Sequence, residues 1–191
     1  KMFKNKKINA KSKFFRWLPD NTVQVIMQRG RYKRCTADPL AISLSFWESF
    51  GPQITIGVRS INVLYDDFST RDSVLLKIRV EAKMYFDFRN ASSTLATRLV
   101  NNPEGMIRGK SQAVVDKTLR REVAKYDARQ LLLPEVLQQL EENLIAKLNI
   151  GLKNFGANVM QAEEAVVIKE VLPPVPIQEA RTQVITVAET T

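Results

Sequence analysis

The spacing of hydrophobic residues changes twice along this chain. From Val74 to Phe88, apolar residues occupy every second position, and charged residues occupy most of the positions between them. A period of two over about fifteen residues predicts a long strand with one buried and one solvated face. Shorter β-rich runs precede it and predict an antiparallel sheet meander in which the long strand is central. They cover Thr22–Gln28, Tyr32–Thr36, Leu40–Phe46 and Gln53–Tyr65.

Beyond the long strand the apolar spacing becomes 3.6, which is typical of helices. It predicts a short helix over Ala91–Val100 and a longer one over Glu104–Tyr126. A third helix opens at Pro134, where the missing N–H of proline costs little, and Gly156 is expected to end it. A closing strand follows over Asn158–Leu172. Strands followed by helices and a last strand predict an α+β fold with helices packed on the sheet.

These elements divide the chain into three parts. Residues 1–21 are a basic arm that ends in a turn, and residues 22–176 form one domain. Residues 177–191 follow a proline-rich stretch and are predicted to begin a helical C-terminal extension. No apolar run approaches the length of about 18 residues that a membrane span needs.

The positive charge of the chain is concentrated at its beginning. The chain has 191 residues, of which 29 are Lys or Arg and 20 are Asp or Glu, so its net charge is +9. Residues 1–35 alone carry eleven basic side chains and one acid, while the remaining 156 residues total −1. A neutral body with one basic end favours contact with a polyanionic surface. An RNA-binding arm is the weaker interpretation, because the body has no second basic strip and no base-stacking motif, so we expect no nucleic-acid partner.

The composition excludes several kinds of catalysis. The chain has no histidine, so it has no imidazole base, no Ser–His or Cys–His pair and no histidine metal ligand. Its one thiol, Cys35, cannot form an internal disulfide or a cysteine-based zinc site. The glycines of residues 105–111 (GMIRGKS) are one residue too close together for a P-loop. These features remove the commonest routes to hydrolysis and the usual zinc sites. Serine–lysine catalysis stays open, although nothing in the sequence marks a particular pair, and we name no catalytic residue, metal site or cofactor.

Three segments together carry a resemblance to a known family. Residues 29–32 (RGRY) are similar to the opening strand pair of that family. Residues 68–73 (FSTRDS) are similar to its entry into a long central strand, and this is the strongest of the three likenesses. Residues 118–120 (TLR), with the third helix and the closing strand after them, are similar to its later motifs. In this order and spacing, residues 22–176 resemble the SPFH domain, named for the stomatin, prohibitin and flotillin proteins.

The resemblance implies a non-enzymatic scaffold associated with the cytoplasmic or organelle face of a membrane. Members of the family associate side by side into rings or cages through this domain and a helical extension after it. They organise lipid and partner proteins, including membrane proteases and channels. The resemblance therefore implies lipid, a homo-oligomer and a membrane protease or channel as partners, and an apolar span before Lys1 with a long helix after Thr191. The alternative is a regulatory adaptor that binds one membrane protease or channel as a small oligomer.

The basic arm is the first candidate for membrane contact. A helix over residues 8–18 would place aromatic side chains in the headgroup region and basic side chains against anionic lipid, each charge contributing roughly 1 kcal/mol. The alternative is that the lysines only flank a transmembrane helix on its cytoplasmic side. Both interpretations place the domain at a membrane. The predicted contacts in the arm are Lys7, Lys11, Lys13, Phe14, Phe15, Arg16, Trp17 and Leu18.

The second candidate is the loop from Leu40 to Gly51, which carries aromatic residues among serines. Aromatic rings in such a loop either pack onto the sheet or insert into lipid, where tryptophan favours the interface. Phe46 and Trp47 are the predicted membrane contacts of this loop.

Charged residues on the second and third helices are the candidates for contact between copies of the chain. Their charges alternate in sign, so they can dock one neighbour against the next, although ordinary solvation explains the same pattern. The predicted interface residues are Arg120, Arg121, Glu122, Lys125, Glu141, Glu142 and Lys147.

Overall fold

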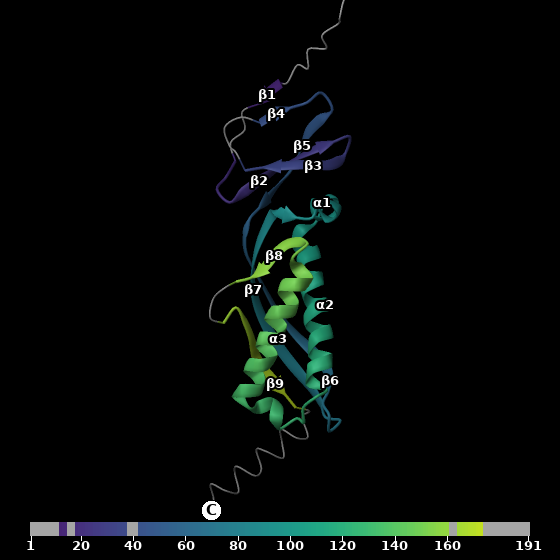
Figure 1. Cartoon of the computed structure of the whole chain (residues 1–191), viewed down its shortest axis with the longest axis vertical. Helices are drawn as coiled ribbons and strands as arrows, with labels where there is room; N and C mark the ends of the chain where they lie inside the picture. Colours follow the sequence, from purple (N-terminus) through teal and green to yellow (C-terminus); the bar gives the residue numbers. More distant parts are fainter. Residues whose placement is uncertain (1–11, 15–17, 38–41, 161–163, 174–191) are drawn as a thin grey trace, which may run out of the picture.

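A computed structural model describes residues 12–14, 18–37, 42–160 and 164–173 of the chain (Figure 1). These residues form an α+β structure in which the strands pair in antiparallel fashion. The strands are β1 (Ser12–Phe14), β2 (Thr22–Gln28), β3 (Arg31–Thr36), β4 (Ile42–Leu44), β5 (Glu48–Thr55), β6 (Gly57–Ser69), β7 (Leu75–Ala91), β8 (Phe155–Val159) and β9 (Val166–Leu172). The helices are α1 (Ser93–Leu99), α2 (Pro103–Val123) and α3 (Pro134–Leu152), with a short 3-10 helix at Gln130–Leu132.

The long strand predicted from the alternating pattern is β7, and it is the centre of a four-stranded sheet. β6 pairs along one side of it, and β8 and β9 pair with successive parts of the other side. The alternating apolar side chains of β7 are at most 2% exposed, as predicted for the buried face. They are Leu76, Ile78, Val80, Ala82, Met84, Phe86 and Phe88.

α2 and α3 lie side by side over the buried face of this sheet (Figure 1). Leu119 of α2 and Leu144 of α3 are completely buried in the same core as β7. Burying one such side chain contributes about 1.5–3 kcal/mol, so this layer supplies much of the stability of the fold. On the opposite face, ion pairs join neighbouring strands. They are Lys77–Asp66 at 3.1 Å, Arg79–Glu170 at 3.4 Å and Lys169–Glu81 at 3.7 Å.

The topology of the first strands corrects the predicted meander. The strand predicted over Thr22–Gln28 is confirmed with the same bounds. It lies between β3 and β5 in a three-stranded sheet, so successive strands are not all neighbours. Gly51 and Pro52, which fall between the predicted strands Leu40–Phe46 and Gln53–Tyr65, lie inside β5. Among the described strands, β5 pairs with β2 alone. An edge strand of this kind tolerates proline, because the backbone on its outer side makes no hydrogen bonds to a neighbouring strand.

The chain crosses from the three-stranded sheet to the four-stranded sheet at Ile56. The strand predicted over Gln53–Tyr65 is therefore two strands, β5 and β6. The backbone N–H of Ile56 donates to the carbonyl oxygen of Asn21 at 2.6 Å, which holds the crossing point against the start of β2. Gly57 follows with φ of 152°, a conformation that favours glycine.

The predicted closing strand over Asn158–Leu172 is also two strands. β8 pairs with β7 near Met84 and Phe86, while β9 pairs with the earlier stretch from Lys77 to Ala82. Both strands run antiparallel to β7 in the same direction, so β9 continues the path of β8. They are separated opposite a single residue of β7, Lys83, whose carbonyl oxygen accepts the N–H of Met160 and whose N–H donates to the carbonyl oxygen of Ala165. The alternation of apolar residues does not reveal this break.

The described part of the basic arm is extended and does not have the helical conformation considered for residues 8–18. β1 (Ser12–Phe14) pairs with β4 as a two-stranded sheet. Leu18 is 5% exposed, so it lies in the interior and not at the surface that a membrane contact requires. The helical extension predicted over residues 177–191 lies outside the described residues.

Gly156 occupies a close backbone contact. It does not end α3, which stops at Leu152, but lies in β8 with φ of 72°. A Cβ at this position would overlap the carbonyl oxygen of Asp87 and lie 2.9 Å from the amide nitrogen of Ala91. β8 approaches β7 this closely at the irregularity in their register between Phe86 and Ala91.

We expect Gly156→Ala to lower the free energy of unfolding by about 2 kcal/mol or more, because the positive φ and the overlap both oppose a side chain. Gly109→Ala is the matched control, since Gly109 lies in α2 with nothing within 4 Å of an added Cβ. It should raise stability by about 0.5–1 kcal/mol. Urea denaturation measures both changes, and a Gly156→Ala protein as stable as the wild type would contradict this contact.

Candidate functional site

Two turns lie side by side at one end of the three-stranded sheet. Gln28, the last residue of β2, pairs with Arg31 of β3 and also with Glu48 of β5. The turn after β2 and the turn before β5 therefore project from the same end. Arg29 and Gly30 have φ of 51° and 77°, which makes theirs a two-residue hairpin turn with both central residues in the left-handed region.

Two exposed aromatic side chains lie at this end of the sheet. Phe46 is 85% exposed and Trp47 is 58% exposed, and their rings meet edge to face with centroids 4.9 Å apart. The guanidinium carbon of Arg29 lies 5.0 Å from the centroid of the Trp47 ring, within the range of a cation–π interaction. We call Arg29, Phe46 and Trp47 the aromatic tip. Phe46 does not pack onto the sheet, because most of its side chain is in solvent.

Glu48 holds the turn that presents the aromatic tip. Its carboxylate accepts a hydrogen bond from the Arg34 side chain at 3.1 Å and another from the backbone N–H of Ser45 at 3.0 Å. The Arg34 bond, together with the Ser45 bond, holds the pKa of Glu48 below its usual value. Glu48 is therefore charged at neutral pH and fixes both ends of the turn.

The described part of the arm lies beside the strand that leads into the aromatic tip. Ser12 of β1 pairs with Leu44 of β4, which ends shortly before Phe46. The two stretches predicted to contact a membrane therefore belong to one part of the fold. Lys13 and Phe14 lie in β1. The other predicted arm contacts, Lys7, Lys11, Phe15, Arg16 and Trp17, lie outside the described residues.

Two of the predicted interface residues make contacts between different elements of the fold. Arg120 forms an ion pair with Asp116 at 3.0 Å, and its guanidinium lies 5.2 Å from the centroid of the Phe68 ring. Glu141 accepts the backbone N–H of Ile168 at 2.8 Å. These contacts attach α2 to β6 and α3 to β9, so both side chains have a structural role.

The other predicted interface residues lie on the helix surfaces. Glu122 and Lys125 pair with each other at 2.5 Å at the end of α2. Glu142 accepts a hydrogen bond from the side chain of Gln138 at 3.2 Å, while Arg121 and Lys147 are exposed. Contact between copies through these residues stays a prediction.

The FSTRDS segment, the strongest part of the family resemblance, fastens the entry of β7 to the connection between α2 and α3. The Thr70 hydroxyl donates to Asp72 at 2.5 Å, and Asp72 accepts the backbone N–H of Ala128 at 3.1 Å. Arg71 donates to both carboxylate oxygens of Asp127, at 2.9 and 2.6 Å. The Thr70 hydrogen bond lowers the pKa of Asp72. The polar residues of this segment thus bind each other and neighbouring backbone, which is a structural role.

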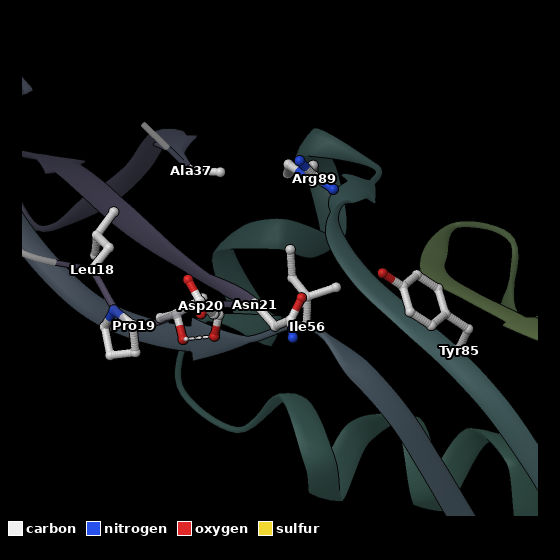
Figure 2. A pocket seen from close by; sticks show the side chains of 9 residues that line it. Leu18, Pro19, Asp20, Asn21, Ala37, Ile56, Tyr85 and Arg89 are labelled. Atoms are coloured by element: carbon white, nitrogen blue, oxygen red, sulfur yellow. Dashed lines mark hydrogen bonds between the residues drawn. The ribbon is translucent and has the colours of Figure 1, made fainter. Parts of the chain in front are cut away.

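A pocket of about 300 Å³ lies where the two larger sheets join (Figure 2). Figure 2 shows Tyr85 and Arg89 of β7 on one side of it, with Leu18, Pro19 and Asp20 on the other. The lining is mixed in charge and polarity. No single ligand chemistry follows from such a lining.

A buried carboxylate holds Arg89 at the wall of this pocket. Asp87 is 6% exposed, and the Arg89 side chain donates to its two oxygens at 2.9 Å from Nε and 2.6 Å from Nη2. Burial opposes the ionisation of Asp87, but the bonds from Arg89 outweigh it and keep the pKa of Asp87 below its usual value. Because this ion pair neutralises Arg89 within the chain, we interpret the pocket as a joint between the sheets.

No protein-family model matches the chain, and no curated protein matches it. In the part of the chain that the structure describes, no group of three or more Cys, Asp or Glu side chains could hold a metal ion. No helix among these residues is long and apolar enough to cross a membrane. Membership of the SPFH family therefore stays a hypothesis that rests on the sequence motifs.

We expect Asp87→Asn to lower the free energy of unfolding by about 2 kcal/mol at neutral pH, since it removes charge-assisted hydrogen bonds from a buried site. Folding lowers the pKa of Asp87. Its stabilising contribution is therefore complete above the unfolded value of about 4 and is lost as the pH falls through the folded value. In acid the wild type should lose more stability than the variant.

Asp66→Asn is the control for this experiment, because Asp66 forms an ion pair with Lys77 that is about half exposed on both sides. It should cost less than about 1 kcal/mol. Urea denaturation at neutral pH and at about pH 3 measures all three proteins across the window in which the carboxylate titrates. The same loss of stability in acid for Asp87→Asn and the wild type would contradict the assignment.

Proposed function

We propose that this chain is an SPFH domain that docks on a membrane and assembles side by side into a scaffold. The scaffold is non-enzymatic and organises anionic lipid and membrane proteins at the cytoplasmic or organelle face. The observation that carries the proposal is the aromatic tip, in which two exposed rings and a cation project next to the strand of the basic arm.

The aromatic tip has the chemistry of an interfacial anchor. Tryptophan favours the headgroup level of a bilayer, and a phenylalanine beside it can enter the acyl boundary. Arg29 belongs to the tip, and Arg31 and Lys33 are exposed on the strand that follows. Each cation near an anionic surface contributes roughly 1 kcal/mol, so the tip and the basic arm together give useful but reversible binding.

The long axis of the molecule gives this anchor a direction. The three-stranded sheet lies towards one end, and the turn between β6 and β7 lies at the other (Figure 1). Leu172, the last residue of β9, pairs with Lys77 close to the start of β7. The chain therefore leaves the folded core at the end opposite the three-stranded sheet. A helical extension beginning there would lead away from the lipid, in keeping with the extension through which SPFH proteins assemble.

The fold also supports the family assignment in its coarse features. One long strand is central, two helices cover its buried face and the last strands return to pair with it. The FSTRDS segment enters β7, at the position that the resemblance implies. These features support the proposal. The order of the first strands in their sheet differs from the simple meander that the sequence predicts.

We expect the double substitution Phe46→Ser and Trp47→Ser to lower binding to vesicles of mixed phosphatidylserine and phosphatidylcholine by at least about tenfold, because it removes the apolar part of the anchor. Flotation of the intact protein with these vesicles measures the bound fraction. Binding of the wild type should fall at high salt and on vesicles of phosphatidylcholine alone.

Ile150→Ser is the matched control, because Ile150 is also an exposed apolar residue, at 72%, but lies on α3 away from the tip. It should bind vesicles as well as the wild type. The proposal fails if the wild type does not float with anionic vesicles. The role of the tip fails if the double variant floats as well as the Ile150→Ser control.

A further inference from the structure

One edge of the four-stranded sheet is open to a further strand. β6 is the outer strand on this side, and among the described strands it pairs only with β7. Lys83 of β7 shows which backbone groups of β6 point outward. Its N–H donates to the carbonyl oxygen of Ala165 at 2.7 Å, and its carbonyl oxygen accepts the N–H of Met160 at 3.2 Å. Both backbone groups of Lys83 therefore point away from β6.

Ser60 lies opposite Lys83, so the backbone groups of Ser60 point away from β7 as well. In an antiparallel pair, two opposite residues either exchange both hydrogen bonds or exchange neither. The register of β6 with β7 is regular from Gly57 to Tyr65, so the same direction holds at every second residue. The N–H and carbonyl groups of Val58, Ser60, Asn62 and Leu64 therefore face the outer side. We call residues 58–64 the open edge.

Side chains cover comparable backbone groups on the other side of this sheet. There, Asn149 and Glu141 of α3 accept the backbone N–H groups of Val159 and Ile168, each at 2.8 Å. Within the part of the chain that the structure describes, no strand or side chain bonds the outward groups of the open edge. The open edge also has no proline, no bulge and no lysine, which are the usual devices that keep other strands from an edge. Its chemistry therefore suits the addition of a strand.

An exposed cation flanks the middle of the open edge. Glu104 of α2 forms an ion pair with Arg59 at 3.6 Å, and the carbonyl oxygen of Gln112 accepts the Tyr65 hydroxyl at 3.4 Å. Arg108 is four residues from both Glu104 and Gln112, so it lies on the same flank of α2 and between these two contacts. Arg108 is exposed and takes part in no ion pair within the described residues. Its charge is therefore open to a partner beside the open edge.

We propose that the open edge binds an extended segment of a partner protein as an added antiparallel strand, with an acidic side chain of that segment against Arg108. The outward backbone groups select an extended segment, because a strand can bond them in series. Arg108 selects an acidic segment by charge complementarity. The proposal rests on the proposed function, since it names the surface by which the scaffold would hold a membrane protein.

The probe is a synthetic peptide of sequence TVTETVT with blocked ends and a fluorescent label. In a strand, its glutamate and valines lie on one face and its threonines on the other. Fluorescence anisotropy with the intact protein in solution measures its affinity. A peptide with lysine in place of the glutamate should bind at least about threefold more weakly, because like charges then meet at Arg108. The Arg108→Glu protein should reverse this preference.

N-methylated peptides test the backbone contact without any change to the protein. With the glutamate on the side of α2, the threonines lie opposite Ser60 and Asn62, so their N–H groups point at the open edge. Methylation of the two inner threonine nitrogens should lower the affinity at least about tenfold, because it removes these donors. Methylation of the two valine nitrogens is the matched control and should leave the affinity unchanged, since those N–H groups point away.

Asn62→Pro tests the same contact from the side of the protein. Proline removes an outward N–H and leaves the bonds between β6 and β7 in place, which an edge strand tolerates. Asn62→Ala removes the side chain but keeps the N–H, so it is the matched control. We expect Asn62→Pro to bind the probe at least about tenfold more weakly than Asn62→Ala.

The proposal is overturned if the wild type does not bind the probe, or if methylation of the threonines has no more effect than methylation of the valines. A wild-type dimer that Asn62→Pro abolishes in analytical ultracentrifugation would assign the open edge to a second copy and would also overturn it. Because these measurements contain no lipid, they leave the flotation result unchanged, and the proposed function fails only by its own test.

Discussion

β7 connects the three-stranded sheet to the four-stranded sheet that α2 and α3 cover. Its alternate side chains are buried under α2 and α3, and three strands pair along its two sides. Its last residues continue beyond the helices to the three-stranded sheet, where Phe88 meets Tyr32 edge to face with ring centroids 5.6 Å apart. The buried ion pair of Asp87 and Arg89 lies at the same joint. A single strand therefore sets the direction of the aromatic tip relative to the helical layer.

This connection gives the proposed scaffold its geometry. Lipid contact at the aromatic tip would orient the long axis of every copy in the same way. Copies that share one orientation would then meet side by side, as the proposed assembly requires.

Local patterns predicted the elements but not their partners. The alternation in β7 and the helical spacing of α2 reflect which residues face the core. This pattern is visible directly in the amino-acid sequence. The break at Ile56 and the division of Asn158–Leu172 into two strands depend on pairing with distant strands, which periodicity does not reveal. The contact of Arg29 with Trp47 likewise follows from Gln28 pairing with both β3 and β5. Phe46 and Trp47 were predictable as candidates because aromatic residues in a serine-rich loop are unusual; their cationic neighbour was not.

Electron microscopy of the intact protein on anionic vesicles tests the central claim most directly. The account predicts closed rings or cages on the membrane, with the three-stranded sheet of each copy towards the bilayer and the β6–β7 turn away from it. Membrane-bound monomers or small complexes alone would contradict the scaffold and favour a regulatory adaptor of a membrane protease or channel.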